Sequence, residues 1–176
     1  MATFTITGDI KAIERAIRKE PKIARAAAIS AINKTVAIAQ TAGVRELGRV
    51  KKLPARLVKA RTKVRRASLR RLSATLTALT AGLPIDRLKF RELKKGISAA
   101  GKKYPHAFIV QKTKALIFER KVIGGQRAAR LPIERVKVEL NPEASTIFER
   151  VTNAAVRKDL QRIFDNDLRF RLRRRG

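Results

Sequence analysis

Residues 49–71 form a basic stretch with eleven Lys and Arg residues in twenty-three positions and no acidic residue. The interval without acids is longer still, because no Asp or Glu lies between Glu46 and Asp86. Folded surfaces usually mix both signs of charge, since repulsion between like charges opposes a compact state. We therefore expect this stretch to need a counter-charge from another molecule. An ordinary solvated basic face is the alternative, but this chain is basic nearly throughout.

The whole chain shares this excess of positive charge. It carries 43 Lys and Arg residues against 14 Asp and Glu residues, a formal net charge of +29. Three kinds of partner have the opposite charge: nucleic acid, an anionic membrane and an acidic protein surface. The 176 residues suit one domain, and a domain of this size buries about 70% of its unfolded surface. Since 44% of the residues are hydrophobic, we expect a folded protein rather than a disordered polycation.

The chain lacks the residues that several classes of catalytic and metal-binding site require. The chain has no cysteine, which excludes disulfides, thiolate catalysis and thiol redox chemistry. His106 is the only histidine, so a histidine metal site and a Ser-His-Asp triad both lack members. No Gly-rich phosphate loop occurs. We therefore expect no enzyme, no cofactor and no metal. The acids Glu119, Glu134, Glu139 and Glu149 stand near basic residues, which predicts charge pairing.

Membrane association is the least favoured of the three partner classes. The first residues lack the pattern of a signal peptide, and no run of about eighteen apolar residues occurs. The basic helices described below are rich in small residues and lack aromatic anchors. We expect neither a secreted protein nor a membrane protein.

The first third of the chain predicts one short strand and three helices. Residues 3–7 alternate apolar residues with threonines, which is typical of a strand. Asp9 is placed to cap a helix that ends at Pro21. A second helix, from Pro21 to about residue 47, has an apolar stripe and many alanines, which allow close approach of a neighbour. Residues 55–60 predict a short basic helix.

The next segment changes to the two-residue period of β-strands. Two strands, or one strand with a break near residues 67–71, are predicted between positions 61 and 78. If the first is a strand, Arg61, Lys63 and Arg65 point the same way and present a row of cations.

Turns and short strands are predicted for the rest of the middle. Residues 85–90 predict a short strand. Residues 94–104 predict a mobile loop or a hairpin tip, and are the segment we most expect to be disordered. Strands are predicted again at residues 106–110 and 115–121. The core candidates of these two strands are Phe108, Leu116 and Phe118.

A strand and a long helix are predicted for the last quarter. The strand follows a mobile basic connection, begins at Pro132 and carries Val136, Val138 and Leu140 on one face. Residues 141–143 read Asn-Pro-Glu, which predicts a capping Asn, a Pro in the first helical position and an acid in the first turn. We expect this helix to reach about residue 172.

The predicted fold class is α+β in a single domain spanning residues 1–176. Residues 1–60 are mainly helical, residues 61–140 are β-rich with mobile basic loops, and residues 141–176 form the C-terminal helix. We expect the long N-terminal and C-terminal helices to pack on a central antiparallel β-sheet.

The candidate binding residues belong to two clusters, the basic stretch 49–71 and the C-terminal arginine cluster 169–175. Trp is absent and Tyr104 is the only tyrosine, so contact with phosphates is favoured over stacking on bases. Acidic protein neighbours are an alternative of equal weight. The candidates are Arg49, Lys51, Lys52, Arg56, Lys59, Arg61, Lys63, Arg65, Arg66, Arg70, Arg71, Arg169, Arg171, Arg173, Arg174 and Arg175.

Four segments together resemble the prophage minor tail protein Z family of long-tailed phages. Residues 107–121 read AFIVQKTKALIFERK, and residues 130–140 read RLPIERVKVEL before a charged terminal helix. In the first half, an Ala-rich helix has Asn33 near its middle, and residues 52–61 read KLPARLVKAR. The resemblance covers nearly the whole chain and depends on the order and spacing of these segments.

The resemblance implies a tail completion protein, a structural component of the virion at the head-proximal end of the tail. Such a protein supports head-tail joining and the placement of DNA in the tail. The resemblance also implies partners: the tail terminator, tail tube or other neck proteins, DNA in the tail lumen, and further copies in a homo-oligomeric ring. Assembly would take place in the host cytoplasm.

Two functions of other classes compete with this interpretation. One is a stand-alone nucleic-acid-binding protein without sequence specificity, similar in composition to a ribosomal protein. The other is a hydrolase or nuclease of the packaging apparatus, which the lack of clustered acids and histidines disfavours.

Overall fold

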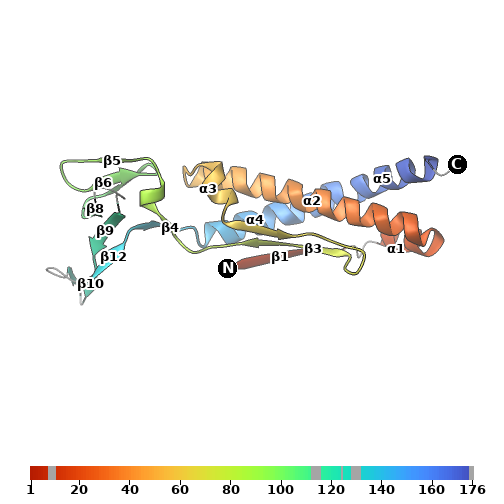
Figure 1. Cartoon of the computed structure of the whole chain (residues 1–176), viewed down its shortest axis with the longest axis horizontal. Coiled ribbons are helices and arrows are strands. Elements are labelled where there is room, and N and C mark those ends of the chain that lie inside the picture. The colour runs from red at the N-terminus through yellow and green to blue at the C-terminus, as the bar shows by residue number, and fades with distance from the viewer. Residues whose placement is uncertain (8–10, 112–115, 124, 128–131, 175–176) are drawn as a thin grey trace.

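Long helices packed side by side form one half of the molecule. The computed structural model describes residues 1–7, 11–111, 116–123, 125–127 and 132–174. The elements of the helical half are α1 (Lys11–Lys19), α2 (Pro21–Val50), α3 (Ala55–Lys59), α4 (Glu143–Ala155), the π-helical turn η2 (Val156–Leu160) and α5 (Gln161–Arg173). α2 lies against both α4 and α5, and α1 covers the start of α2 (Figure 1). The predicted second, third and C-terminal helices are confirmed; the proposed cap Asp9 lies outside the described residues.

The packing of α2 depends on small side chains. Ala24, Ala27, Ala28 and Ala31 have no exposed surface, so the backbone of a neighbouring helix can come close. Gly43 continues this small face and contacts the ring of Phe148 on α4, which is 1% exposed. The alanine-rich pattern therefore sets a close helix contact, as the sequence predicted.

The start of α4 differs from its prediction. Asn141 does not cap the helix, because Pro142 itself occupies the position before the first helical residue and no side chain caps there. Asn141, joined to Pro142 by a cis peptide bond, accepts a hydrogen bond at Oδ1 from the Ser145 hydroxyl at 3.2 Å. A side chain that precedes the cap position by one residue is badly placed to reach the free N–H groups of the first turn.

One three-stranded antiparallel sheet lies against these helices. Its strands are β1 (Ala2–Thr7), β3 (Ser73–Ala78) and β2 (Thr62–Arg65), in the order β1-β3-β2. β3 alternates half-buried residues with the buried Ala74, Leu76 and Ala78, and Ile6 of β1 is buried beside them. The predicted strands at 3–7 and between 61 and 78 are confirmed, but their pairing joins segments about seventy residues apart.

The other half of the molecule is built from small antiparallel sheets, visible at the opposite end of Figure 1. A short 3-10 turn, η1 (Ile85–Arg87), follows the first strand of this β-rich half. Two of these sheets have two strands: β4 (Leu83–Pro84) pairs with β13 (Lys137–Val138), and β10 (Val122–Ile123) pairs with β11 (Gln126–Arg127). A three-stranded sheet has β6 (Ile97–Ala99) between β5 (Phe90–Glu92) and β7 (Lys102–Tyr104). Another has β9 (Leu116–Arg120) between β8 (Phe108–Gln111) and β12 (Ile133–Arg135).

Two predictions for this half are wrong. Residues 85–90 are not a strand, because η1 turns the chain and lets Asp86 accept both guanidinium hydrogen bonds of Arg135, at 3.0 and 2.6 Å. Residues 94–104 are not disordered: β6 and β7 form a hairpin whose Ile97 is 2% exposed, which confirms the alternative of a hairpin tip.

The predicted core residues of β8 and β9 are on the less buried face. Ile117 is fully buried, whereas Leu116 and Phe118 are half-buried and Phe108 is 37% exposed. Successive side chains of a strand point to opposite faces, so a choice shifted by one residue exchanges inside and outside. The apolar run Leu-Ile-Phe does not show which face is inside. The predicted face of Val136, Val138 and Leu140 is confirmed, since all three are buried.

The α+β class is confirmed, but the long helices do not sit on one central sheet. They pack mainly on each other, and the β1-β3-β2 sheet covers α2 and α4 from one side. The remaining strands form separate sheets beyond the end of α2 (Figure 1). The predicted basic connection, which follows the turn at residues 123–126 and runs to Arg130, lies largely outside the described residues.

Replacing Gly43 with Ala should destabilise the protein. In an exposed helix this change stabilises by about 1 kcal/mol, but here the new Cβ would lie 2.6 Å from Cδ1 of Phe148. Overpacking of a core costs up to about 3 kcal/mol, and this contact is with the ring itself, so we expect a net loss of up to about 2 kcal/mol in urea unfolding. The same change in a Phe148→Leu background should cost less. A higher urea midpoint for Gly43→Ala alone would contradict the contact.

Candidate nucleic-acid or acidic-partner interface

The basic stretch begins at the end of α2 and follows α3, β2 and the turn before β3. α3 is held by Val58, which is 2% exposed, so that its basic residues face outward. β2 is the edge strand of its sheet and alternates half-buried with exposed residues. Eight of the candidates in this stretch are exposed: Arg49, Lys52, Arg56, Lys59, Lys63, Arg65, Arg66 and Arg70. Within the described part of the chain, no carboxylate forms an ion pair with any of these eight.

Three other candidates of the basic stretch hold the fold together. Lys51, with a side chain only 11% exposed, donates to Oε1 of Glu143 on α4 at 2.6 Å. Arg61 donates to the carbonyl oxygens of Ala81 and Gly82, at 3.5 and 3.4 Å. Arg71 donates to the carbonyl oxygens of Arg66 and Ser73, at 3.0 and 3.3 Å. These three side chains satisfy groups within the protein and are poorly available to a partner.

The predicted row of cations on β2 is therefore shorter than expected. Lys63 and Arg65 are exposed on the same face, as the strand period predicted. Arg61 lies before the first residue of β2 and folds back toward Gly82, so it leaves the row. Arg66 and Arg70 lie in the turn that follows, and extend the exposed basic surface beyond the strand.

Asn33 of α2 fixes this turn. Its side-chain Nδ2 donates to the carbonyl oxygen of Ala67 at 3.2 Å, and its Oδ1 accepts from the Ala67 amide at 2.8 Å. The amide side chain thus pairs with both backbone groups of one residue, as a neighbouring strand does. Ala67 is 6% exposed, so the turn is anchored while the arginines on both sides of it face solvent. The sequence placed Asn33 in a helix but did not show this role.

The C-terminal arginine cluster is only partly free. Arg169, Arg173 and Arg174 are exposed, and Arg174 lies over the ring of Phe170 at 5.6 Å from its centroid. Arg171 donates to Asp167 at 2.8 Å. Arg175 lies outside the described residues.

The structure does not merge the two basic clusters into one site. Phe170, Arg171 and Arg174 lie beside Lys22 and Ile23 at the start of α2, whereas Arg49 lies at its end. At 1.5 Å per residue these ends of α2 are about 40 Å apart. Between the two clusters, Lys34 of α2 lies 3.8 Å from Asp167 of α5.

The carboxylates that form ion pairs are not those the sequence suggested. Among the described residues, Glu119, Glu134, Glu139 and Glu149 form none. The ion pairs between described residues instead involve Glu46, Asp86, Glu143, Asp159 and Asp167.

Side chains of consecutive residues point in different directions on a strand or a helix, so an acid need not face the cation next to it in sequence, which explains the wrong choice. Glu134 of β12 lies opposite Glu119 of β9, another acid. Burial and the charge of Glu119 together raise the pKa of Tyr104.

Other candidate sites carry little chemistry. Within the described ranges no group of three or more His, Cys, Asp or Glu side chains is placed to hold a metal ion. His106 is exposed. In the same part of the chain, no helix has the length and apolar character needed to cross a membrane.

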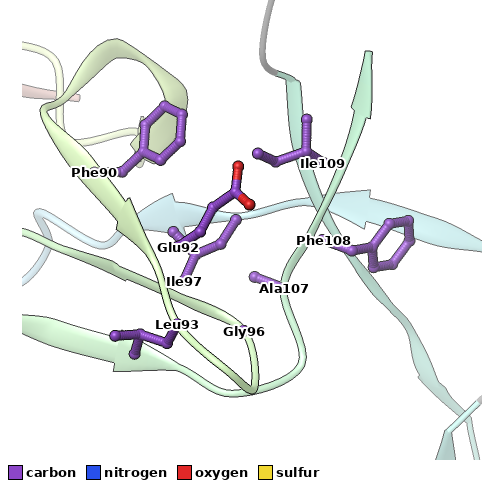
Figure 2. A pocket seen from close by; sticks show the side chains of 8 residues that line it. All are labelled: Phe90, Glu92, Leu93, Gly96, Ile97, Ala107, Phe108 and Ile109. Carbon is purple, nitrogen blue, oxygen red and sulfur yellow. The ribbon is translucent and has the colours of Figure 1, made fainter. Parts of the chain in front are cut away.

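A cavity of about 690 Å³ in the β-rich half was not predicted. Figure 2 shows the Glu92 side chain among the apolar residues Phe90, Ile97, Ala107 and Ile109 that line it. These residues come from β5, β6, β8 and the residue before β8, so no local sequence pattern marks them. The cavity holds none of the predicted binding residues.

The model of the family described as prophage minor tail protein Z (GPZ) matches residues 10–175. The chain belongs to this family. No curated protein and no solved structure matches it. The resemblance noted in the sequence is thereby confirmed, and membership of the minor tail protein Z family implies a structural role in the phage tail and contact with other tail or neck proteins. A structural role of this kind depends on surfaces that contact other tail proteins.

In this tail protein, replacing Asn33 with Ala should release the basic turn. Losing a pair of partly buried hydrogen bonds costs about 1 to 2 kcal/mol. We also expect faster hydrogen exchange at the Ala67 amide, which donates directly to Asn33. Lys34→Ala, an exposed neighbour on α2, is the control and should leave the Ala67 amide protected. Unchanged exchange in Asn33→Ala would exclude the positioning role.

The Lys51–Glu143 contact predicts a loss of stability in acid. The hydrogen bond from Lys51 lowers the pKa of Glu143 from its ordinary value of 4.5, aided by backbone hydrogen bonding. The stabilisation is therefore complete above the unfolded value and disappears as the pH falls through the lower, folded value. Glu143→Gln should show a smaller decrease in urea midpoint than the natural protein between about pH 6 and pH 3. Glu149→Gln, at an exposed and unpaired acid, should behave like the natural protein.

Proposed function

We propose that the protein is a tail completion subunit at the head-proximal end of the phage tail. There its basic surface meets DNA in the lumen or acidic faces of the tail terminator, tube or other neck proteins. In this role it supports head-tail joining and the placement of DNA. The observation that carries the proposal is the set of exposed cations along the end of α2, α3, β2 and the following turn, none of which forms an ion pair with a described residue.

The internal ion pairs of the protein occupy acids that could otherwise balance the exposed cations, which supports the binding of an external counter-charge. Several of its 14 acids are already engaged, among them Glu46, Asp86, Glu143 and Asp167, so they are not free to balance the exposed cations. At physiological ionic strength, charges closer than about 8 Å still repel. Neighbouring cations on α3 and β2 therefore favour a bound polyanion or an acidic protein surface.

A ring of identical subunits is part of the proposal. We treat residues 1–176 as one domain, and each copy carries a net charge of +29. A ring would bring these charges together, so it should form only with DNA or acidic neighbours present, and dissociate when isolated at low salt. The ring would assemble in the host cytoplasm and remain in the virion.

Contact with phosphates is favoured over the reading of bases. The exposed basic surface has few exposed aromatic residues near it, with Phe170 already under Arg174. Phosphate contacts position a protein on nucleic acid without specifying sequence. The stand-alone nucleic-acid-binding protein remains the competing function, and it requires tight binding by the isolated chain.

Imaging of the intact neck at side-chain resolution tests the proposal. We expect this protein at the head-proximal end of the tail, with Lys63, Arg65 and Arg70 within ion-pair distance of DNA phosphates or carboxylates. If these side chains and the C-terminal arginine cluster both face bulk solvent, the proposed use of the basic surface is wrong.

Two variants that lose the same number of cations distinguish the effect of this surface from the effect of total charge. Replacing Lys63, Arg65 and Arg70 with Ala should reduce the yield of infectious particles in a phage that lacks its own copy. The control replaces Arg18, Arg25 and Lys158, which are exposed cations outside both clusters. Equal losses of infectious particles for both variants would show that only total charge matters.

Binding of the purified chain to duplex DNA can also be measured as a function of salt. A log-log salt slope of about −5 would mean about six phosphate contacts.

A further inference from the structure

A groove between α2 and α3 combines an apolar floor with a cationic rim. Its volume is about 400 Å³. Val44 and Leu53 line it as buried apolar residues, and Gly48 lies beside them. Its exposed polar boundary carries three cations, Arg45 on α2 and Arg56 and Lys59 on α3. Arg45 was not among the residues predicted from the sequence.

The local sequence builds this groove. Thr41, Arg45 and Gly48 are spaced by four and three residues, which places them on one face of α2. The chain leaves α2 through a turn in which the Leu53 amide donates to the carbonyl of Gly48 at 2.8 Å. A Cβ on Gly48 would lie 3.0 Å from the Leu53 carbonyl oxygen, so glycine allows this close return. The return brings α3 beside α2 and leaves the groove between them.

Two hydrogen bonds of Thr62 hold the end of α3 beside α2. The Thr62 hydroxyl accepts a hydrogen bond from Gln40 at 2.7 Å and donates to the Lys59 carbonyl at 2.9 Å. The end of α3 is thereby tied to α2 through the first residue of β2. Arg56 and Lys59, three residues apart on α3, then lie on the same helical face at the rim.

The rim cations have no internal counter-charge. Among the described residues, none of Arg45, Arg56 and Lys59 forms an ion pair. The nearest acid in sequence, Glu46, is already bound by Arg150 of α4. The groove therefore offers an apolar seat next to unpaired positive charge.

We propose that this groove docks an acidic segment of a neighbouring tail protein, with one apolar side chain seated against Val44 and Leu53. The inference rests on the proposed function and names the partner chemistry for this part of the basic surface. DNA phosphates gain nothing from an apolar floor, whereas an acidic peptide with a Leu or Ile uses both floor and rim. A second copy of this chain is a poor occupant, because its 14 acids are scattered among 43 cations.

Synthetic peptides test the groove directly. The first probe is a fluorescent twelve-residue peptide with two leucines flanked by glutamates, and the second replaces both leucines with serine. Anisotropy titrations at about 0.15 M salt should show the leucine peptide binding the full-length protein at least about tenfold more tightly. Equal affinity for the two peptides would overturn the proposal, since charge alone would then explain binding.

Paired variants locate the binding to the groove. Arg56→Ala with Lys59→Ala should weaken binding of the leucine peptide about tenfold. Arg18→Ala with Arg25→Ala removes the same charge outside both clusters and should change this binding less than about threefold. Ala55→Phe, at an exposed residue lining the groove, should block the peptide without changing charge. Ala42→Phe is its control, because Ala42 is exposed on α2 outside the groove. Equal effects of the groove and control variants would exclude the site.

A duplex DNA of about twelve base pairs serves as the third probe. We expect Ala55→Phe to leave DNA binding unchanged while it abolishes leucine-peptide binding. If the DNA competes with the peptide and Ala55→Phe weakens both alike, the groove is a nucleic-acid contact and the acidic-peptide proposal fails. These outcomes do not depend on the position of the protein in the tail, so the proposed function is tested separately by imaging.

Discussion

The contact between α2 and the C-terminal helices holds the helical half of the molecule and its basic surface in place. α2 brings a face of alanines and Gly43 against α4, where Phe148 fills the space that a larger side chain would occupy. Once α2 is held there, Asn33 anchors the basic turn, Lys51 joins Glu143, and the return after Gly48 brings α3 alongside. The basic surface is therefore a consequence of how one long helix is packed.

In the described part of the chain, the acids that form ion pairs hold elements of the fold together and do not pair with the exposed cations of α3, β2 and the turn. Three acids form ion pairs that join separate elements: Glu46 to α4, Asp86 to β12, and Glu143 to the connection after α2. The exposed cations of α3, β2 and the turn receive no such partner among the described residues. A minor tail protein works inside a larger particle, and neighbours can supply the missing negative charge there. The apolar groove beside α3 adds a way for such a neighbour to bind by shape as well as charge.

Features set by residues close together in the chain could be predicted from the sequence, whereas features set by distant residues could not. α2 and α3 were predicted because proline, alanine and apolar spacing act within a few residues. The face of β9 was wrong, since Leu116, Ile117 and Phe118 are all apolar and only packing shows which one is inside. Among the binding candidates, Arg61 and Arg71 were taken for free cations, but they bond to carbonyl oxygens that the chain brings near only after folding.

The sequence by itself determined the helices, the strands at residues 2–7, 62–65, 73–78, 108–111 and 116–120, the absence of thiol and histidine-triad chemistry, and the excess of positive charge, because these follow from residue type and short-range spacing. The tertiary structure alone decided which cations remain available, that β1 pairs with β3, and that the two basic clusters lie at different places along α2. It also decided the groove, whose floor and rim come from residues on two elements. The physical reason is that burial, ion pairing and strand order depend on contacts between residues far apart in the chain, and a local pattern carries no record of those contacts.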